Sequence, residues 1–327
     1  MVDMTAALGS LTLPNPVLTA SGCAAAGREL HQFFDVSRLG AVVTKSIMTR
    51  PRSGRPTPRM AETPSGMLNS IGLQGPGIDA FIATDLAWLE EHGARVVASI
   101  AGTHTDEYVE LARRLAGHPA VAMLEVNISC PNVETRGQVF ACDAIASSRV
   151  IGAVRRAADP NQPVFAKLSP DVTDITLIAR ACADAGADGL SLINTLLGMV
   201  IDTDTMRPVL GGVTGGLSGP AIRPVAVRCV WQVRNAVPHL PILGMGGIRT
   251  GLDALEFVLA GASAVSVGTA VFGDPSAPVR VLAELEQALD DRGFSRLADA
   301  VGHAHRKDDS PCDERFAVAE RTGARNA

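Results

Sequence analysis

Residues 241–271 read PILGMGGIRTGLDALEFVLAGASAVSVGTAV and contain a short apolar run, an amphipathic segment and a second apolar run. The runs 241–247 and 264–271 have the length and composition of buried strands, whereas the apolar residues of 252–262 recur with helical spacing. A strand, a helix and a second strand in this order predict two parallel strands joined by a right-handed crossover.

The same alternation continues along the whole chain. Apolar runs typical of buried strands occur at eight places: 16–22, 41–46, 95–102, 123–130, 163–170, 189–195, 241–247 and 264–271. Helix-like segments lie between them: 106–117, 174–186 and 252–262. Repeated strand–helix units indicate an α/β protein with a parallel sheet. At 327 residues a closed (β/α)8 TIM barrel is the expected fold. An open, doubly wound sheet is the alternative.

Two connections are longer than ordinary strand-to-helix loops. Residues 47–76 follow the second strand and are rich in Pro, Gly and Arg, and residues 196–217 follow the sixth strand. Active sites of such barrels lie at the carboxyl ends of the strands, so both insertions are candidate covers of the site. Decoration of the surface is the alternative. We expect one domain over 1–305 and a polar tail over 306–327.

Composition limits the classes of partner. The chain is 46% hydrophobic and 19% charged, with a net charge of −5 and a pI near 5.8, which disfavours nucleic acid or an anionic membrane surface. No apolar run approaches the ~20 residues of a membrane helix, and the N-terminus lacks the pattern of a secretory signal. We therefore expect a cytoplasmic protein.

The six cysteines are scattered, and no two are spaced as C-x-x-C. This pattern is typical of free thiols in a reducing compartment rather than of a disulfide framework. It also argues against an iron–sulfur cluster within this chain. We expect no metal site.

Lysine is rare in this chain. There are three lysines among 29 basic residues, and two of them, Lys45 and Lys167, lie near the ends of apolar runs. A buried ammonium group is costly unless it meets an anion or several acceptors. The two positions therefore favour an anionic ligand, and the alternative is a salt bridge that closes a layer of the barrel interior.

Four asparagines fall where strands are expected to end. They are Asn69, Asn127, Asn132 and Asn194. Each side chain offers one acceptor and two donors, so together they suit a planar ring that carries amide N–H and C=O groups. A single asparagine at a strand end is more often a turn former.

Glycine follows the last two predicted strands, in GMGGI (244–248) and SVGTAV (266–271). In barrels of this type, the loops after strands seven and eight often bind phosphate through backbone N–H groups. These segments therefore predict a phosphorylated cofactor.

Cys130 lies in EVNISCPNV (125–133), between Asn127 and Asn132. A thiol at a polar strand end near lysines can have a lowered pKa and act as a base or nucleophile. For the other five cysteines we expect a packing role, since free cysteine behaves as a small hydrophobic residue.

These residues resemble the class 1 dihydroorotate dehydrogenases, over residues 5–305. The motifs that carry the resemblance are ASGC (20–23), TKSIMTRPRSGRPTPRMAETPSGMLNSIGLQGPG (44–77), EVNISCPNV, FAKLSPDVTDI (165–175), SLINT (191–195), GGLSGPAIRP (215–224), GMGGI and VGTAV. GREL (27–30), together with RPTPRMAETPSGMLNSIGLQ (55–74), is more similar to the NAD-linked, heteromeric type 1B enzymes than to the fumarate-using homodimers.

The resemblance implies that the chain oxidises (S)-dihydroorotate to orotate in de novo pyrimidine biosynthesis. Cys130 would remove the C5 proton, and one FMN per chain would accept hydride from C6. The implied substrate-binding residues are Lys45, Asn69, Ser70, Ile71, Gly72, Leu73, Asn127, Asn132, Asn194 and Thr195. The implied FMN-binding residues are Ala20, Ser21, Gly22, Lys45, Ser46, Ser99, Asn127, Lys167, Ile193, Ser218, Gly219, Gly246, Gly247, Gly268 and Thr269.

The type 1B resemblance also implies a partner. In that family a second subunit carries FAD and a [2Fe–2S] cluster and passes electrons to NAD⁺, so a homodimer or a heterotetramer is expected. Residues 133–143 depart from the family pattern, because VETRGQVFACD replaces a glycine-rich loop.

Two other functions compete with this one. The first is a flavin reductase similar to the dihydropyrimidine dehydrogenases, which act on uracil or thymine and tend to place His where this chain has Asn132. The second is a barrel that keeps FMN only for assembly or electron transfer. Retention of Lys45, Cys130 and the four asparagines argues against that role.

Overall fold

The computed structural model describes residues 2–129, 131–132 and 138–306. Eight parallel strands form its central sheet: β3 (Val17–Thr19), β4 (Val42–Val43), β7 (Val96–Ile100), β8 (Val121–Asn127), β11 (Val164–Leu168), β12 (Gly189–Leu192), β17 (Ile242–Met245) and β18 (Ala264–Val267). Each overlaps one of the apolar runs predicted as a strand. The hydrogen-bonded order is β3-β18-β17-β12-β11-β8-β7-β4.

The two outer strands of this sheet, β3 and β4, also meet. Leu18 forms a parallel bridge with Ala41, and the N–H of Gly40 donates to the carbonyl of Val17 at 2.9 Å. The N–H of Val43 donates to Thr19 Oγ1 at 2.9 Å. These contacts close the sheet, so the predicted barrel is confirmed and the open sheet is wrong.

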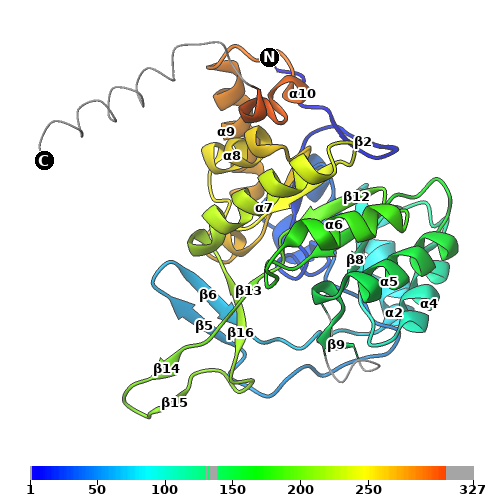
Figure 1. The fold of residues 1–327 in the computed structure, drawn as a ribbon, viewed down its shortest axis with the longest axis vertical. Coiled ribbons are helices and arrows are strands. Elements are labelled where there is room, and N and C mark those ends of the chain that lie inside the picture. Colours follow the sequence, from blue (N-terminus) through cyan, green and yellow to red (C-terminus); the bar gives the residue numbers. More distant parts are fainter. Residues whose placement is uncertain (1, 130, 133–137, 307–327) are drawn as a thin grey trace, which may run out of the picture.

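Helices surround the barrel (Figure 1). The longer ones are α4 (Thr105–Leu115), α5 (Ala144–Ala157), α6 (Ile175–Asp184), α7 (Arg223–Ala236), α8 (Gly251–Ala260) and α9 (Ala277–Asp290). The shorter ones are α1 (Arg28–His31), α2 (Ile78–Ala80), α3 (Ala87–Glu91) and α10 (Leu297–Ala300), with a π-helical turn, Phe81–Leu86, between α2 and α3. Single 3-10 turns occupy Val36–Arg38, Phe140–Cys142, Pro220–Ile222, Thr269–Phe272 and His303–His305. The three predicted helical segments correspond to α4, α6 and α8.

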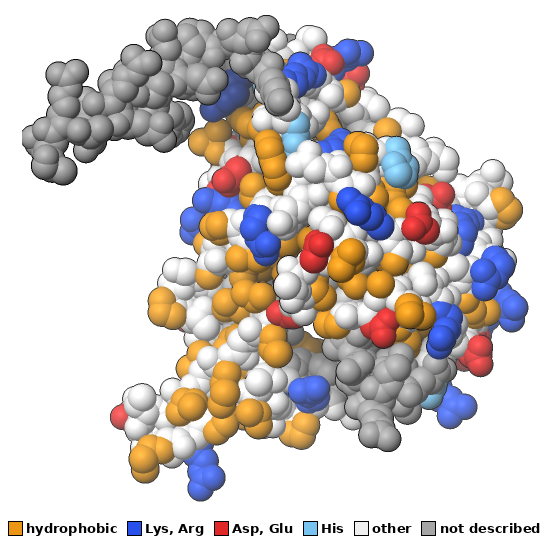
Figure 2. Space-filling model, viewed as in Figure 1, with side chains coloured by type: hydrophobic (Ala, Val, Ile, Leu, Met, Phe, Trp, Pro, Cys, Tyr) orange, Lys and Arg blue, Asp and Glu red, His pale blue; other side chains and the backbone are white. Residues whose placement is uncertain are grey.

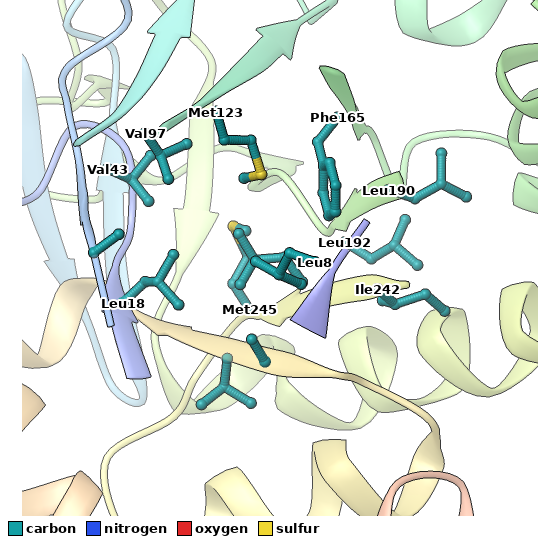
Figure 3. Close-up of a cluster of buried hydrophobic side chains, with 14 of the residues drawn as sticks. Leu8, Leu18, Val43, Val97, Met123, Phe165, Leu190, Leu192, Ile242 and Met245 are labelled. Carbon is teal, nitrogen blue, oxygen red and sulfur yellow. The ribbon is translucent and has the colours of Figure 1, made fainter. Parts of the chain in front are cut away.

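An N-terminal hairpin, β1 (Ala6–Leu8) and β2 (Leu11–Leu13), covers the amino end of the barrel. A Cβ at Gly9 in its turn would lie 3.5 Å from the Cβ of Asp188 and 3.7 Å from that of Pro163, just before β12 and β11. Leu8 and Leu13 are fully buried, and Figure 3 shows Leu8 within the cluster of buried apolar side chains. The amino half of the barrel is thus an apolar core.

The two long insertions pair with each other in a four-stranded antiparallel sheet, which we call the cover sheet. Its strands, in order, are β13 (Leu196–Gly198), β16 (Gly215–Ser218), β6 (Gly66–Asn69) and β5 (Met60–Thr63). In Figure 1 it lies at the end of the molecule opposite the N-terminal hairpin. The two insertions were predicted as covers, but their pairing was not.

The chain also forms two small hairpins outside the barrel and the cover sheet. Beyond β13 the chain forms β14 (Ile201–Asp202) and β15 (Arg207–Pro208), and after β8 it forms β9 (Pro131–Asn132) and β10 (Gln138–Val139). Figure 2 shows hydrophobic side chains gathered over β14 and β15, where Ile201 and Met206 are exposed. Within the described part of the chain, no helix combines the length and hydropathy needed to cross a membrane. The predicted tail, apart from Arg306, lies outside the described residues.

Gly189 leaves room for the ring of Phe165 in the barrel interior. Phe165 on β11 stands in register with Gly189 on β12. A Cβ at residue 189 would lie 2.1 Å from Phe165 Cζ, far inside van der Waals contact. The aromatic ring therefore occupies the space that any larger residue at position 189 would need.

We predict that Gly189→Ala lowers the free energy of unfolding by about 1–3 kcal/mol, the usual cost of overpacking a core. Gly273→Ala is the matched control, because residue 273 has helical backbone angles and nothing lies within 4 Å of its added Cβ. Urea unfolding followed by circular dichroism measures both. Equal stability of the two variants would contradict the argument, and Phe165→Leu should restore part of the loss.

Candidate active site

Two cavities adjoin at the carboxyl ends of the barrel strands. The first, of about 500 Å³, lies toward β17 and β18, and the second, of about 610 Å³, lies beneath the cover sheet. We call them the glycine-lined cavity and the amide-lined cavity. Residues that line both are Ser21, Cys23, Lys167, Asn194, Thr195, Ser218 and Thr269. The two cavities therefore share a wall, and ligands in them would lie side by side.

The glycine-lined cavity contains most of the residues predicted to bind FMN. They are Ala20, Ser21, Lys167, Ile193, Ser218, Gly219, Gly246, Gly247, Gly268 and Thr269. Gly247 has φ +82°, and a Cβ there would lie 2.7 Å from the carbonyl oxygen of Gly219. Glycine is therefore required for the turn after β17 to pack against Gly219. The turn also presents backbone without side chains to the cavity, and phosphate sites use backbone N–H groups.

A buried hydroxyl group at the wall of this cavity indicates whether a polar cofactor would fit. Ser266 Oγ on β18 is buried, lines the cavity and has no hydrogen-bond partner among the described residues. Nearby, Thr269 Oγ1 donates to Ser218 Oγ at 2.8 Å. An unpaired buried hydroxyl costs free energy unless a ligand satisfies it. The glycine turn and this hydroxyl together fit a phosphorylated, polar cofactor such as FMN.

We predict that Ser266→Ala leaves the flavin-free chain as stable as before, or up to ~1 kcal/mol more stable, while it weakens FMN binding by about 5- to 10-fold. Ser99→Ala is the matched control, because Ser99 Oγ lies 3.0 Å from Ser46 Oγ and its loss should destabilise the chain by ~0.5–1.5 kcal/mol. Urea unfolding and FMN titration provide the two measurements. Equal destabilisation by both changes would show that Ser266 has a partner within the protein.

The amide-lined cavity contains all of the predicted substrate-binding residues except Asn132. They are Lys45, Asn69, Ser70, Ile71, Gly72, Leu73, Asn127, Asn194 and Thr195. Gly22 and Ser46, predicted to bind FMN, also line it. The side chain of Asn132 lies outside the described residues.

Asn127 is the centre of the hydrogen-bond network in this cavity. Its Nδ2 donates to Ser46 Oγ at 3.0 Å, and its Oδ1 accepts from Asn194 Nδ2 at 3.4 Å. Tyr108 OH on α4 donates to its backbone carbonyl at 2.9 Å. Side chains from three different strand ends are thereby held against one another. Of the four asparagines predicted to share one face, Asn127 and Asn194 are in direct contact, and Asn69 lines the same cavity.

Ser99 differs in position from the other predicted FMN-binding residues. It is fully buried and lines neither cavity, but its hydroxyl lies 3.0 Å from Ser46 Oγ, which in turn lies 3.2 Å from Ser21 Oγ. Ser99 therefore supports Ser46 from behind. Binding of FMN by Ser99 stays a prediction.

Cys130 lies outside the described residues. Ser129, the residue before it, lines the amide-lined cavity, and its N–H donates to Asn127 Oδ1 at 3.2 Å. Ser129 Oγ is buried without a hydrogen-bond partner among the described residues. The chain that leaves β8 thus reaches the cavity one residue before the predicted base.

Lys167 forms the buried salt bridge that was the alternative at its position, and it also lines the cavities where the predicted anionic ligand would bind. It lines both cavities and is 5% exposed, and its Nζ lies 3.6 Å from Oε1 of the fully buried Glu125. The anionic ligand and the buried salt bridge are therefore not exclusive for this lysine. Lys45 lines the amide-lined cavity.

Two residues that line the cavities, Cys23 and Arg55, were not predicted as site residues from the sequence. Cys23 lines both cavities; burial raises the pKa of its thiol, and the charges of Lys167 and Lys45 oppose that rise. Arg55 lines the amide-lined cavity and donates from Nη1 to Ser70 Oγ at 3.3 Å. Two features of the sequence could have identified these residues. The insertion 47–76 is rich in arginine, which points to Arg55, and Cys23 belongs to the ASGC motif (20–23).

The profile of the family described as dihydroorotate dehydrogenase matches residues 4–289. A protein of Pelobacter propionicus is 53% identical over 300 residues, which cover 92% of this chain and 98% of the relative. One of Desulforudis audaxviator is 53% identical over 305 residues, 93% and 98% of the two chains, and one of Geobacter sulfurreducens is 51% identical over 300 residues, 92% and 97%. All three relatives are named dihydroorotate dehydrogenase B (NAD(+)), catalytic subunit.

Proposed function

The chain belongs to the dihydroorotate dehydrogenase family, and we propose how its residues divide the work of that reaction. It is an oxidoreductase that oxidises dihydroorotate to orotate, a step of pyrimidine biosynthesis. The observation that carries the proposal is the shared wall of the two cavities. Hydride transfer needs donor and acceptor in contact, and adjoining cavities with different linings provide this for a pyrimidine and a flavin.

The glycine-lined cavity would hold the cofactor, in this proposal one FMN per chain. Gly246, Gly247 and Gly268 would receive its phosphate through backbone N–H groups, and Ser266 would bind a polar group of the ring or ribityl chain. FMN bound there would supply the acceptor for the hydride that leaves C6 of the substrate. The ammonium of Lys167, at the wall of both cavities, would stabilise the added negative charge.

The amide-lined cavity would orient the substrate. Lys45 would meet its carboxylate, and Asn69, Asn127 and Asn194 would bind the amide groups of its ring. The proton at C5 is next to a carbonyl carbon, so its removal places charge on oxygen, which amide donors stabilise. Cys130 would take that proton. The support for this role is the position of Ser129 at the cavity wall.

The names of the relatives imply that a partner subunit completes the enzyme. In our proposal that subunit carries FAD and a [2Fe–2S] cluster, takes electrons from FMN and delivers them to NAD⁺. The assembly would be a homodimer of this chain or a heterotetramer with the partner. We place the reaction in the cytoplasm, in keeping with the scattered, unclustered cysteines of the chain.

A dihydropyrimidine dehydrogenase activity is not favoured. The relatives that match over nearly the whole chain carry the dihydroorotate dehydrogenase name. Dihydrouracil also lacks the carboxylate that Lys45 would bind.

Substrate preference distinguishes dihydroorotate oxidation from the uracil-reducing activity. We predict that the purified chain is yellow and that its flavin absorbance bleaches anaerobically with dihydroorotate but not with dihydrouracil, because only dihydroorotate carries the carboxylate. Stopped-flow absorbance with each substrate gives the comparison. The opposite preference would favour the uracil-reducing activity instead.

The base is tested by substitution. We predict that Cys130→Ala slows flavin reduction by dihydroorotate by about 10²- to 10⁴-fold, the span typical of a lost general base, with FMN still bound. Cys142→Ala is the control, because Cys142 is an exposed free cysteine that lines neither cavity. A Cys130 variant that reduces at the native rate would remove this thiol from the mechanism.

A further inference from the structure

Glu125 is a buried carboxylate that the proposed reaction does not use. Its side chain is fully buried, and neither of its oxygens has a hydrogen-bond partner among the described residues. Its charged neighbour is Lys167, whose Nζ lies 3.6 Å from Oε1. A carboxylate buried in this way is costly, and the cost falls only if an opposite charge lies close by.

The position of Glu125 along its strand is informative. Alternate residues of a strand point to the same side, so Met123, Glu125 and Asn127 of β8 form one row. Figure 3 shows Met123 in the apolar cluster, whereas Asn127 lines the amide-lined cavity. Glu125 thus lies between the apolar core and the cavity.

The neighbouring strand explains the contact with Lys167. β8 and β11 run parallel, with Asn127 in register with Lys167 and Glu125 in register with Phe165. Lys167 therefore lies on the neighbouring strand, two residues further toward the carboxyl end of the barrel than the residue in register with Glu125. It brings a carboxylate beneath a lysine that lines both cavities.

We infer that Glu125 is a positioning residue: it holds the ammonium of Lys167 at the wall between the cavities and limits the positive charge that a flavin bound there experiences. The inference rests on the proposed function. A lysine with no counter-charge would make the bound flavin easier to reduce, whereas a paired lysine moderates this effect. Glu125 therefore sets the reduction potential through Lys167, without touching substrate or cofactor.

The test is Glu125→Gln, which keeps the size of the side chain and removes its charge. We expect the equilibrium constant for two-electron reduction of the bound flavin to rise at least tenfold, a potential about 30 mV more positive. Photochemical reduction of the full-length flavin-loaded chain with reference dyes measures it. The inference is overturned if the reduction potential falls, or if the equilibrium constant for flavin reduction changes less than about twofold.

Glu256→Gln is the matched control. Glu256 Oε2 lies 3.1 Å from Nε of Arg223, and its side chain is 50% exposed on the outer helix α8. This change removes the same charge from an ion pair that water already screens, so the equilibrium constant should change less than about twofold. A tenfold change here would mean that the potential follows the net charge of the chain, which also overturns the inference.

A second variant tests whether Glu125 changes the flavin potential through Lys167 or by a direct effect of its own charge. Lys167→Met should make the potential more negative, and Glu125→Gln added to it should change the potential far less than it does in the native chain. An equal change in both backgrounds overturns the inference. If the single Glu125 variant loses its flavin, recovery of flavin binding in the double variant supports the pairing, and continued loss contradicts it.

Failure of the proposed function gives a different result. A native chain that binds no flavin would refute the assigned cofactor and this inference together. A native chain that binds flavin, bleaches with dihydroorotate and has a potential insensitive to Glu125→Gln would refute this inference alone.

Discussion

Closure of the parallel sheet is the constraint on which the site depends. The bridge between Leu18 and Ala41 joins β3 to β4, and in a closed parallel barrel every strand then ends on the same rim. Residues as distant in the chain as Ser46, Asn127 and Asn194 come within hydrogen-bonding distance for this reason alone. A shift of any strand by one residue would turn its polar side chain toward the outer helices.

The interior of the barrel changes from apolar to polar within a few residues. On β8 the change runs from Met123 to Glu125, and on β11 from Phe165 to Lys167, in each case over two residues or roughly 6–7 Å. The apolar layer below excludes water and lowers the local dielectric, so charges above it interact strongly. The same packing that stabilises the fold therefore makes a buried ion pair effective as an electrostatic control of the cavity.

The eight strands and the helices α4, α6 and α8 were predictable, because length and hydrophobic period are local properties. The cover sheet was not, since it depends on pairing between β6 and β16, far apart in the chain. Glu125 could be assigned a partner only once the register of β8 and β11 was known. The burial of Ser99 behind Ser46 was not predictable either, because the depth of a residue within a strand depends on the elements that pack around it.

The cover sheet also illustrates how insertions can shape a site without a core of their own. A Cβ at Gly216 would lie 2.1 Å from Thr195 Oγ1, so the backbone of β16 rests directly on the barrel rim. Asn69 on β6 is in register with Gly216 and donates from Nδ2 to its carbonyl at 3.3 Å. This backbone contact acts together with the packing of Leu196 and Leu217 against the barrel core to fix the height of the sheet above the cavity. Residues 69–73, which we predict to bind the substrate, are thereby held along the wall of the amide-lined cavity.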